Sequence, residues 1–254
     1  MTEVPVLLVY GTTVFAGTPI ASSYDALAQA CGATPVALPY AGMADIWATD
    51  TAFAADIDRR LGRGPHVLPA DEDPAILVGH SAAGPHIAMY LADHPNDRAI
   101  MLASPMNGLE YLEPVNTMIR FATTFCLPVV RSLIHGLFPL LEDLSPQSQF
   151  LAAVRSRVES YADRVVVIAA IHDHVVPWRS SCIPGAPMVL LVDAEEEYSH
   201  YLRLGDPSVM CLYAPGSGHL ECLKQTIVVD LIAHYVTELA SESAPVTPLR
   251  LVSA

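Results

Sequence analysis

Residues 76–84, with the sequence ILVGHSAAG, constrain the fold and the chemistry of this chain more than any other segment. An apolar run ends there at a serine flanked by small residues, and an amphipathic segment follows. A strand that turns sharply into a helix strains the turn residue and projects its side chain above the sheet, and small neighbours let the two elements approach. Gly79 and Ala83 supply that space. We interpret Ser81 as a presented nucleophile, although ordinary strand-to-helix turns also carry serines.

Apolar runs alternate with helical patterns along the chain, which is typical of a mostly parallel sheet with helices on both faces. The expected helices cover about 18–31, 45–61, 82–93 and 220–239. The expected strands are Val6–Tyr10, Pro35–Leu38, Ile76–Val78, Ala99–Ala103, Val165–Ile171 and Val209–Tyr213, with Met188–Val192 as a further, edge strand.

Two segments interrupt this alternation. Residues 105–144 are largely apolar and too long for a simple connection, so we expect a helical cap over about 105–148. The tail from Ser241 onward is rich in Ser and Pro, and we expect it to be flexible. The 254 residues therefore predict a single α/β domain over 1–240, with the cap inserted and a tail over 241–254.

Composition narrows the possible partners and the compartment. The net charge of -14 argues against nucleic acids and anionic membranes as partners. No apolar run reaches the roughly 18 residues of a membrane span. The N-terminus shows no secretion signal, which predicts a cytoplasmic protein. The five cysteines lack CxxC spacing and predict buried reduced thiols, and the acidic clusters at 71–73 and 195–197 read as solvated loops.

A serine hydroxyl is a weak nucleophile, so it needs a histidine to accept its proton and an acid to orient that histidine. Asp173 follows an apolar strand, which places it at the ligand-facing edge of a parallel sheet, although it can also simply cap its turn. His219 ends the run Gly-Ser-Gly-His, whose glycines let the loop bend, before the last helical pattern. His200 is the alternative candidate for the base. The backbone N–H of Ala82, the residue after the nucleophile, is an expected oxyanion donor.

No cofactor or metal is expected. His172 and His174 lack a third ligand at suitable spacing. The sequence contains no GxGxxG, P-loop or CxxC motif, so nucleotide and zinc sites have little support.

The three motifs, in the order Ser, acid, His, resemble those of the α/β-hydrolase superfamily. The segment GHSAAG is similar to the elbow G-x-S-x-G with Ala83 at the last glycine, and residues 173–177 are similar to its acid turn D-x-x-V-P. The early first strand resembles the trimmed fold of small bacterial lipases, which lacks the leading strands, and residues 143–151 are also lipase-like. The run Tyr10-Gly11-Thr12 resembles the H-G-x turn of lipases and esterases, with Tyr10 replacing the histidine, which implies Thr12 as the second oxyanion donor.

The resemblance implies acyl transfer through an acyl-Ser81 intermediate, and we expect a serine hydrolase that cleaves esters of apolar acyl groups. A thioesterase or acyltransferase acting on coenzyme A or acyl carrier protein thioesters in a biosynthetic pathway is the alternative. A third possibility is a hydrolase-fold binding protein without activity. Four arginines, Arg120, Arg131, Arg155 and Arg157, fall in or near the expected cap and form either a carrier-binding patch or its solvated face.

Overall fold

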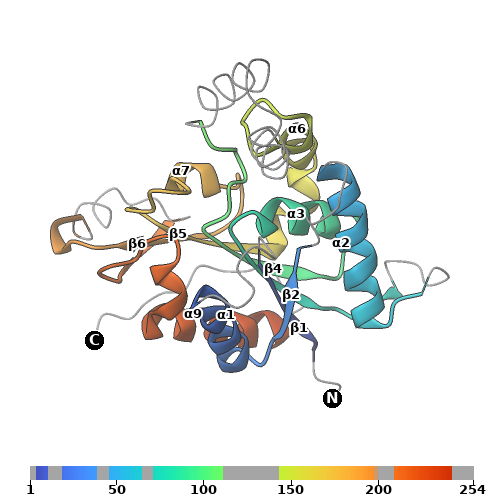
Figure 1. Ribbon diagram of the computed structural model, residues 1–254, viewed down its shortest axis with the longest axis horizontal. Helices are drawn as coiled ribbons and strands as arrows, with labels where there is room; N and C mark the ends of the chain where they lie inside the picture. Colours follow the sequence, from blue (N-terminus) through green and yellow to red (C-terminus); the bar gives the residue numbers. More distant parts are fainter. Residues whose placement is uncertain are drawn as a thin grey trace, which may run out of the picture.

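The computed structural model describes residues 4–10, 19–38, 46–64, 71–110, 143–197, 199 and 209–241. They contain a seven-stranded sheet in the order β2-β1-β3-β4-β5-β6-β7, and every neighbouring pair is parallel (Figure 1). The strands are β1 (Val6–Tyr10), β2 (Thr34–Ala37), β3 (Ile76–His80), β4 (Arg98–Leu102), β5 (Val165–Ala170), β6 (Met188–Val192) and β7 (Val209–Tyr213). The predicted α/β class and parallel sheet are confirmed.

Helices cover both faces of this sheet (Figure 1). On one face lie α1 (Pro19–Ala30) and α9 (Thr226–Ser241), and on the other lie α2 (Ile46–Leu61), α3 (Ala83–Asp93) and α6 (Gln149–Ser156). The short helix α7 (Trp178–Ser181) follows β5. The described residues also form three 3-10 turns: η3 (Val158–Ser160), η4 (Ala162–Arg164) and η5 (Glu221–Lys224).

Two hydrophobic cores follow from the alternation of side chains along each strand. In β1, Leu7 and Val9 pack in the core that contains Phe53 of α2, whereas Leu8 packs in the core that contains Tyr235 of α9. The six residues of β5 divide in the same alternating way, and all six are buried. A strand buried on both faces must be apolar at consecutive positions, which is why the strands read as continuous apolar runs.

The structure corrects two sequence predictions. Met188–Val192 is not an edge strand, because β6 pairs with both β5 and β7 and all five of its residues are buried. On this side of the described sheet the edge strand is β7, where Tyr213 is 46% exposed. The helix expected over 220–239 is broken, because Gln225 is extended (φ -79°, ψ 122°) between η5 and α9.

The two ends of the expected cap meet at one place. Leu109 N donates a hydrogen bond to Leu144 O at 2.8 Å. Gly108 has a φ of +83°, and a Cβ on it would lie 2.6 Å from Pro146 N, so this crossing needs glycine. The intervening residues 111–142, and the tail over 242–254, lie outside the described residues, so the cap, the tail and the domain boundaries stay predictions.

Two further findings concern membrane-spanning helices and cysteine thiols. No helix in the part of the chain that the structure describes is long and apolar enough to cross a membrane. The four described cysteines, Cys31, Cys182, Cys211 and Cys222, are free thiols, and Cys182 is only partly buried.

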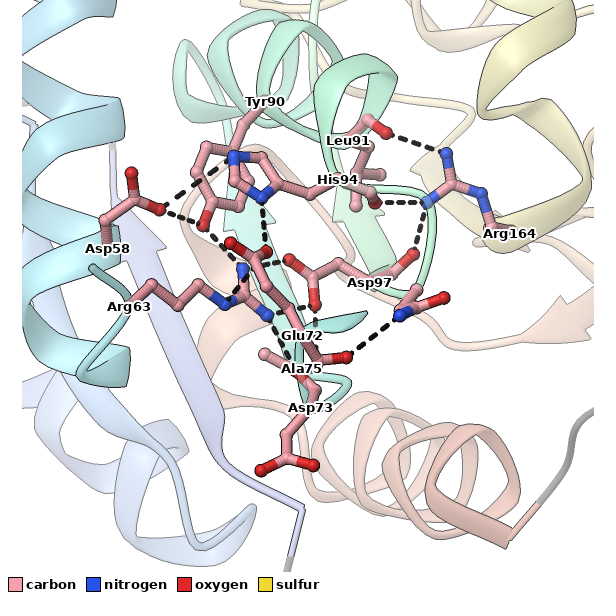
Figure 2. A network of polar contacts seen from close by, with 11 residues as sticks. Asp58, Arg63, Glu72, Asp73, Ala75, Tyr90, Leu91, His94, Asp97 and Arg164 are labelled. Carbon is pink, nitrogen blue, oxygen red and sulfur yellow. Dashed lines mark hydrogen bonds and ion pairs between the residues drawn. The ribbon is translucent and has the colours of Figure 1, made fainter. Parts of the chain in front are cut away.

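A buried ionic network lies at the amino ends of β3, β4 and β5 (Figure 2). Arg63, just after α2, donates from Nη1 and Nη2 to the two carboxylate oxygens of Asp97 at 2.5 and 2.6 Å. Its Nε lies 3.3 Å from Glu72 Oε2. The side chains of Arg63 and Glu72 are each 6% exposed, and that of Asp97 is fully buried. The prediction that the cluster at 71–73 is a solvated loop is therefore wrong for Glu72.

The same network joins loops and strands through backbone groups. Asp97 Oδ1 accepts from Ala75 N at 2.8 Å, immediately before β3 begins. Arg164, immediately before β5, donates to the carbonyl oxygens of Leu91, His94 and Asp97 (Figure 2). Buried charges are tolerated only when they are paired and hydrogen-bonded, and these groups are.

Candidate active site

Ser81 stands between β3 and α3 in a strained backbone conformation. Its φ of 56° lies in the left-handed region, which residues with a Cβ rarely adopt. The Ser81 N–H donates to Leu102 O at the end of β4 at 3.0 Å, and α3 begins only two residues later, at Ala83. The strand-turn-helix geometry expected of a nucleophile elbow is therefore present at Ser81.

Two glycines lie where other side chains approach the elbow most closely. A Cβ on Gly79 would overlap the end of the Ile87 side chain, and a Cβ on Gly84 would overlap the Ser104 side chain after β4. Ala83, at the position of the last motif glycine, is fully buried without such a requirement. The departure from G-x-S-x-G is thus explained, because the close approach of helix and loop occurs one residue later, at Gly84.

Parallel strands deliver the other two residues to the same edge of the sheet. Asp173 follows β5 and His219 follows β7, and their side chains meet Ser81 across β3, β4 and β5. His219 Nδ1 lies 2.8 Å from Asp173 Oδ2, and His219 Nε2 lies 2.9 Å from Ser81 Oγ. The structure therefore brings together the three residues that the sequence singles out. Asp173 lies 46 residues and Ser81 lies 138 residues from His219 along the chain.

The carboxylate of Asp173 is used on both oxygens. Oδ1 accepts hydrogen bonds from Val175 N and Val176 N at 2.7 Å each, and Oδ2 faces His219. Asp173 therefore caps its own turn and also contacts the histidine, so the first contact does not exclude the second. A carboxylate only accepts, so His219 Nδ1 carries the proton and Nε2 presents a lone pair to Ser81 Oγ.

The loop that carries His219 is fixed by contacts that the sequence motifs did not indicate. Gly216 has a φ of +78°, Ser217 N donates to Asp193 Oδ1 after β6, and Ser217 Oγ donates to Ala214 O at 2.6 Å. Gln225 Nε2 donates to Pro215 O at 2.9 Å. These contacts restrain a segment whose glycines permit many conformations.

His80 is a buried polar group next to the nucleophile, and the sequence motifs assign it no role. It is 1% exposed, and its Nδ1 lies 2.7 Å from Tyr24 Oη while its Nε2 lies 2.9 Å from the carbonyl oxygen of His219. Burial, with His219 nearby, lowers the pKa of His80 to about 3. The sequence offered one signal, a polar residue at the end of an otherwise apolar strand.

The remaining predicted residues have different outcomes. Ala82 is 5% exposed and packs with Leu109, Leu144 and Val176 beside the nucleophile. Thr12 and His200 lie outside the described residues. His172 Nε2 contacts Glu197 Oε1 at 2.9 Å, and the described segments contain no group of three His, Cys, Asp or Glu residues arranged to hold a metal.

Comparison with solved structures identifies the fold. Rv0554 from Mycobacterium tuberculosis superposes with a TM-score of 0.54 at 15% identity, over 96% of this chain and 92% of that one. The putative non-heme bromoperoxidase BpoC from M. tuberculosis H37Rv gives 0.52 at 14% identity, over 95% and 94%. The esterase Pf2001 from Pyrococcus furiosus gives 0.50 at 11%, over 94% and 80%.

The chain has the α/β-hydrolase fold, as its sequence motifs imply. No protein-family model matches the sequence, and the comparison with curated proteins finds no match. Fold likeness at such identities carries no activity with it, so function must be argued from the site.

Proposed function

We propose that the protein is a serine hydrolase that cleaves carboxylic esters of apolar acyl groups through an acyl-Ser81 intermediate. The observation that carries the proposal is the continuous hydrogen-bonded chain from Asp173 through His219 to Ser81, which ends on a hydroxyl held at a strained turn. This is the arrangement that activates a serine hydroxyl for attack on a carbonyl carbon.

The proposed reaction has two halves. As Ser81 Oγ attacks the ester carbonyl, its proton passes to His219 Nε2, and Asp173 stabilises the resulting imidazolium. The N–H groups of Ala82 and Thr12 hold the oxyanion. His219 then returns the proton to the leaving alcohol as the ester C–O bond breaks. In the second half a water molecule attacks the acyl-serine and gives a proton to His219. His219 then passes this proton to Ser81 Oγ as the acyl C–O bond breaks, which releases the acid and restores the Ser81 hydroxyl.

The residues packed beside the nucleophile are apolar, which supports an apolar acyl group. Ala82 belongs to a buried apolar cluster with Val176, which follows the Asp173 turn, and with Leu109 and Leu144 from the two ends of the cap insert. An acyl chain that leaves the acyl-serine toward these residues would meet aliphatic surface. The name of one fold neighbour, the Pf2001 esterase, is in keeping with ester hydrolysis.

Fluorophosphonate labelling followed by peptide mapping tests the nucleophile and the base together. We expect the label on Ser81, and we expect Ser81→Ala to abolish labelling. His219→Ala should reduce labelling to a similar extent, whereas His200→Ala should label normally. Label on another serine would reject Ser81 as the nucleophile. The opposite pattern for the two histidines would move the base to His200.

Esters of increasing acyl length test the acyl specificity. We expect kcat/KM to rise from acetyl to medium-chain acyl groups, since each methylene buried from water contributes about 0.8 kcal/mol. Equal values along the series would refute an apolar acyl site.

The thioesterase or acyltransferase alternative is tested with one acyl group presented as a simple ester, a coenzyme A thioester and a carrier-bound thioester. Two of the arginines that suggested a carrier surface are engaged within the protein: Arg155 Nη2 donates to Pro146 O, and Arg157 contacts Asp93. We therefore place ester hydrolysis first. A carrier-bound substrate that is preferred more than about tenfold at low salt, and loses this preference at high salt, would support the alternative.

A further inference from the structure

We propose that His80 and Tyr24 form a neutral positioning pair that fixes the backbone of His219, so that its ring reaches Ser81. The inference rests on the proposed function for its catalytic consequence, and on hydrogen-bond geometry for the pair itself. Neither residue contacts the reacting atoms in the mechanism above. The two would act through the carbonyl oxygen of His219.

Hydrogen-bond chemistry fixes the direction of every contact in the pair. A carbonyl oxygen only accepts, so His80 Nε2, 2.9 Å from His219 O, carries the proton. In a neutral imidazole the other nitrogen, His80 Nδ1, is then the acceptor, and the Tyr24 hydroxyl donates to it at 2.7 Å. His80 and His219 therefore hold opposite tautomers, although their ring centroids lie only 4.8 Å apart.

The pair supplies a donor without supplying a charge. Burial is the main cause that lowers the pKa of His80 to about 3, and burial also raises the pKa of Tyr24 well above its usual range. The titratable groups that act on His80 are His219, which disfavours its charged form, and Asp173, which favours it. A cation at this position would oppose the imidazolium that His219 becomes during attack, whereas a neutral imidazole holds the same carbonyl without that cost.

The location of the pair couples the base to the nucleophile. His80 is the last residue of β3 and directly precedes Ser81, so adjacent residues hold the backbone and the ring nitrogen of His219. Tyr24 comes from α1, and its ring stacks on Tyr10 of β1 with centroids 4.5 Å apart. The sheet and α1 thus brace a glycine-containing loop, and small displacements of a catalytic group are expensive in rate.

Three substitutions separate the donor from the packing. His80→Leu removes the donor, His80→Gln keeps an amide N–H near the position of Nε2, and Tyr24→Phe removes only the hydroxyl. We expect His80→Leu to lower kcat by about 10- to 100-fold with little change in KM, His80→Gln to recover most of that loss, and Tyr24→Phe to fall between them. The rate of fluorophosphonate labelling of Ser81 should follow kcat.

A matched control comes from a second buried tyrosine. Tyr161 is 2% exposed and its hydroxyl donates to Val154 O, away from the site. Tyr161→Phe should therefore leave kcat and the labelling rate unchanged. If it lowers them as much as Tyr24→Phe does, the effect is general loosening and the positioning role is wrong.

Nitrogen-15 NMR of the histidine rings tests the pair without any substrate. We expect His80 to show the Nε2–H tautomer and no titration between about pH 5 and 8, and Tyr24→Phe to shift its Nδ1 resonance. A protonated Nδ1, or titration in this range, would overturn the pair, as would normal kcat and labelling in His80→Leu. A wild-type protein that no fluorophosphonate labels would instead reject the proposed function, and the NMR result alone would then decide on the pair. If His80→Leu does not fold, Tyr24→Phe and His80→Gln carry the same test.

Discussion

Buried polar networks lie at both ends of the parallel strands, and they are built differently. We call these ends the amino edge and the carboxyl edge of the sheet. At the amino ends of β3 to β5, Arg63 donates two hydrogen bonds to Asp97 (Figure 2). Burial alone would lower the pKa of Arg63, but the Asp97 carboxylate raises it above its usual range. At the carboxyl ends, the histidines His80 and His219 connect Tyr24, Asp173 and Ser81. The first network pairs full charges, and the second is a chain of donors and acceptors around one carboxylate.

The two networks differ in whether their hydrogen-bonding groups are all paired within the network. At the amino edge the guanidinium of Arg63 is taken up by Asp97, Glu72, Tyr90 and the Asp73 carbonyl, so the network is closed. At the carboxyl edge the chain ends on Ser81 Oγ, at a residue with positive φ. We infer that the amino edge serves stability and the carboxyl edge serves chemistry.

The largest effect is expected for Ser81→Ala. Activity should fall by about 10³-fold or more, because the nucleophile is lost. Stability should change by no more than about 1 kcal/mol, because one hydrogen bond to His219 is removed and alanine bears the same φ strain as serine. Ester hydrolysis and urea unfolding measure the two quantities. A large loss of stability with retained activity would break the division at this edge.

Arg63→Met should show the opposite behaviour. It leaves Asp97 and Glu72 buried without their cation, so the free energy of unfolding should fall by about 3 to 5 kcal/mol. The kcat of the folded enzyme should stay the same, because the network lies at the other edge of the sheet. Urea unfolding and hydrolysis at low temperature report both values.

Arg59→Met is the matched control for Arg63→Met. The Arg59 side chain is 72% exposed in its ion pair with Asp56, so its loss should change stability by less than about 0.5 kcal/mol. If the two variants are equally stable, the buried network contributes no more than a surface pair, and the proposed role of the amino edge is wrong.

The two edges also differ in how far the sequence predicts them. Ser81, Asp173 and His219 each lie in a short local pattern at the end of an apolar run, and parallel strands bring such positions to one edge. Arg63 and Asp97 lie 34 residues apart in unremarkable segments, and Tyr24 lies 56 residues from His80. Hydrophobic periodicity shows which faces are buried, but it does not show which polar group finds a buried partner.

The same limit explains the errors in the fold. The runs of β6 and β7 are both apolar, and an apolar run does not show whether a strand has one neighbour or two. In the same way, the acidic composition of residues 71–73 favours solvent, although Glu72 is buried by the approach of Arg63 and His94. Partners distant in sequence decide both cases.

Gly84→Ala tests whether close packing, rather than charge, holds the carboxyl edge. The new Cβ would overlap the Ser104 side chain near its own backbone, so we expect a loss of about 1 to 3 kcal/mol in stability together with lower activity. Gly79→Ala is the control, because its Cβ would meet only the flexible end of Ile87, and its effect should be smaller. Equal and negligible losses would show that α3 moves freely at the elbow.

A further effect concerns the pH dependence of stability and depends on the neutral state of His80. Its pKa falls from 6.5 to about 3 on folding, so between these values the unfolded state binds more protons and stability decreases as the pH decreases. This single group contributes a slope of about 1.4 kcal/mol per pH unit, which His80→Gln should remove. Urea unfolding of both proteins between pH 6 and 4 measures the difference, and the remaining titrating groups, those of the amino edge included, cancel in it. Parallel curves would mean that His80 is charged in the folded protein, and the contrast between the paired charges of the amino edge and the neutral His80 at the carboxyl edge would fail.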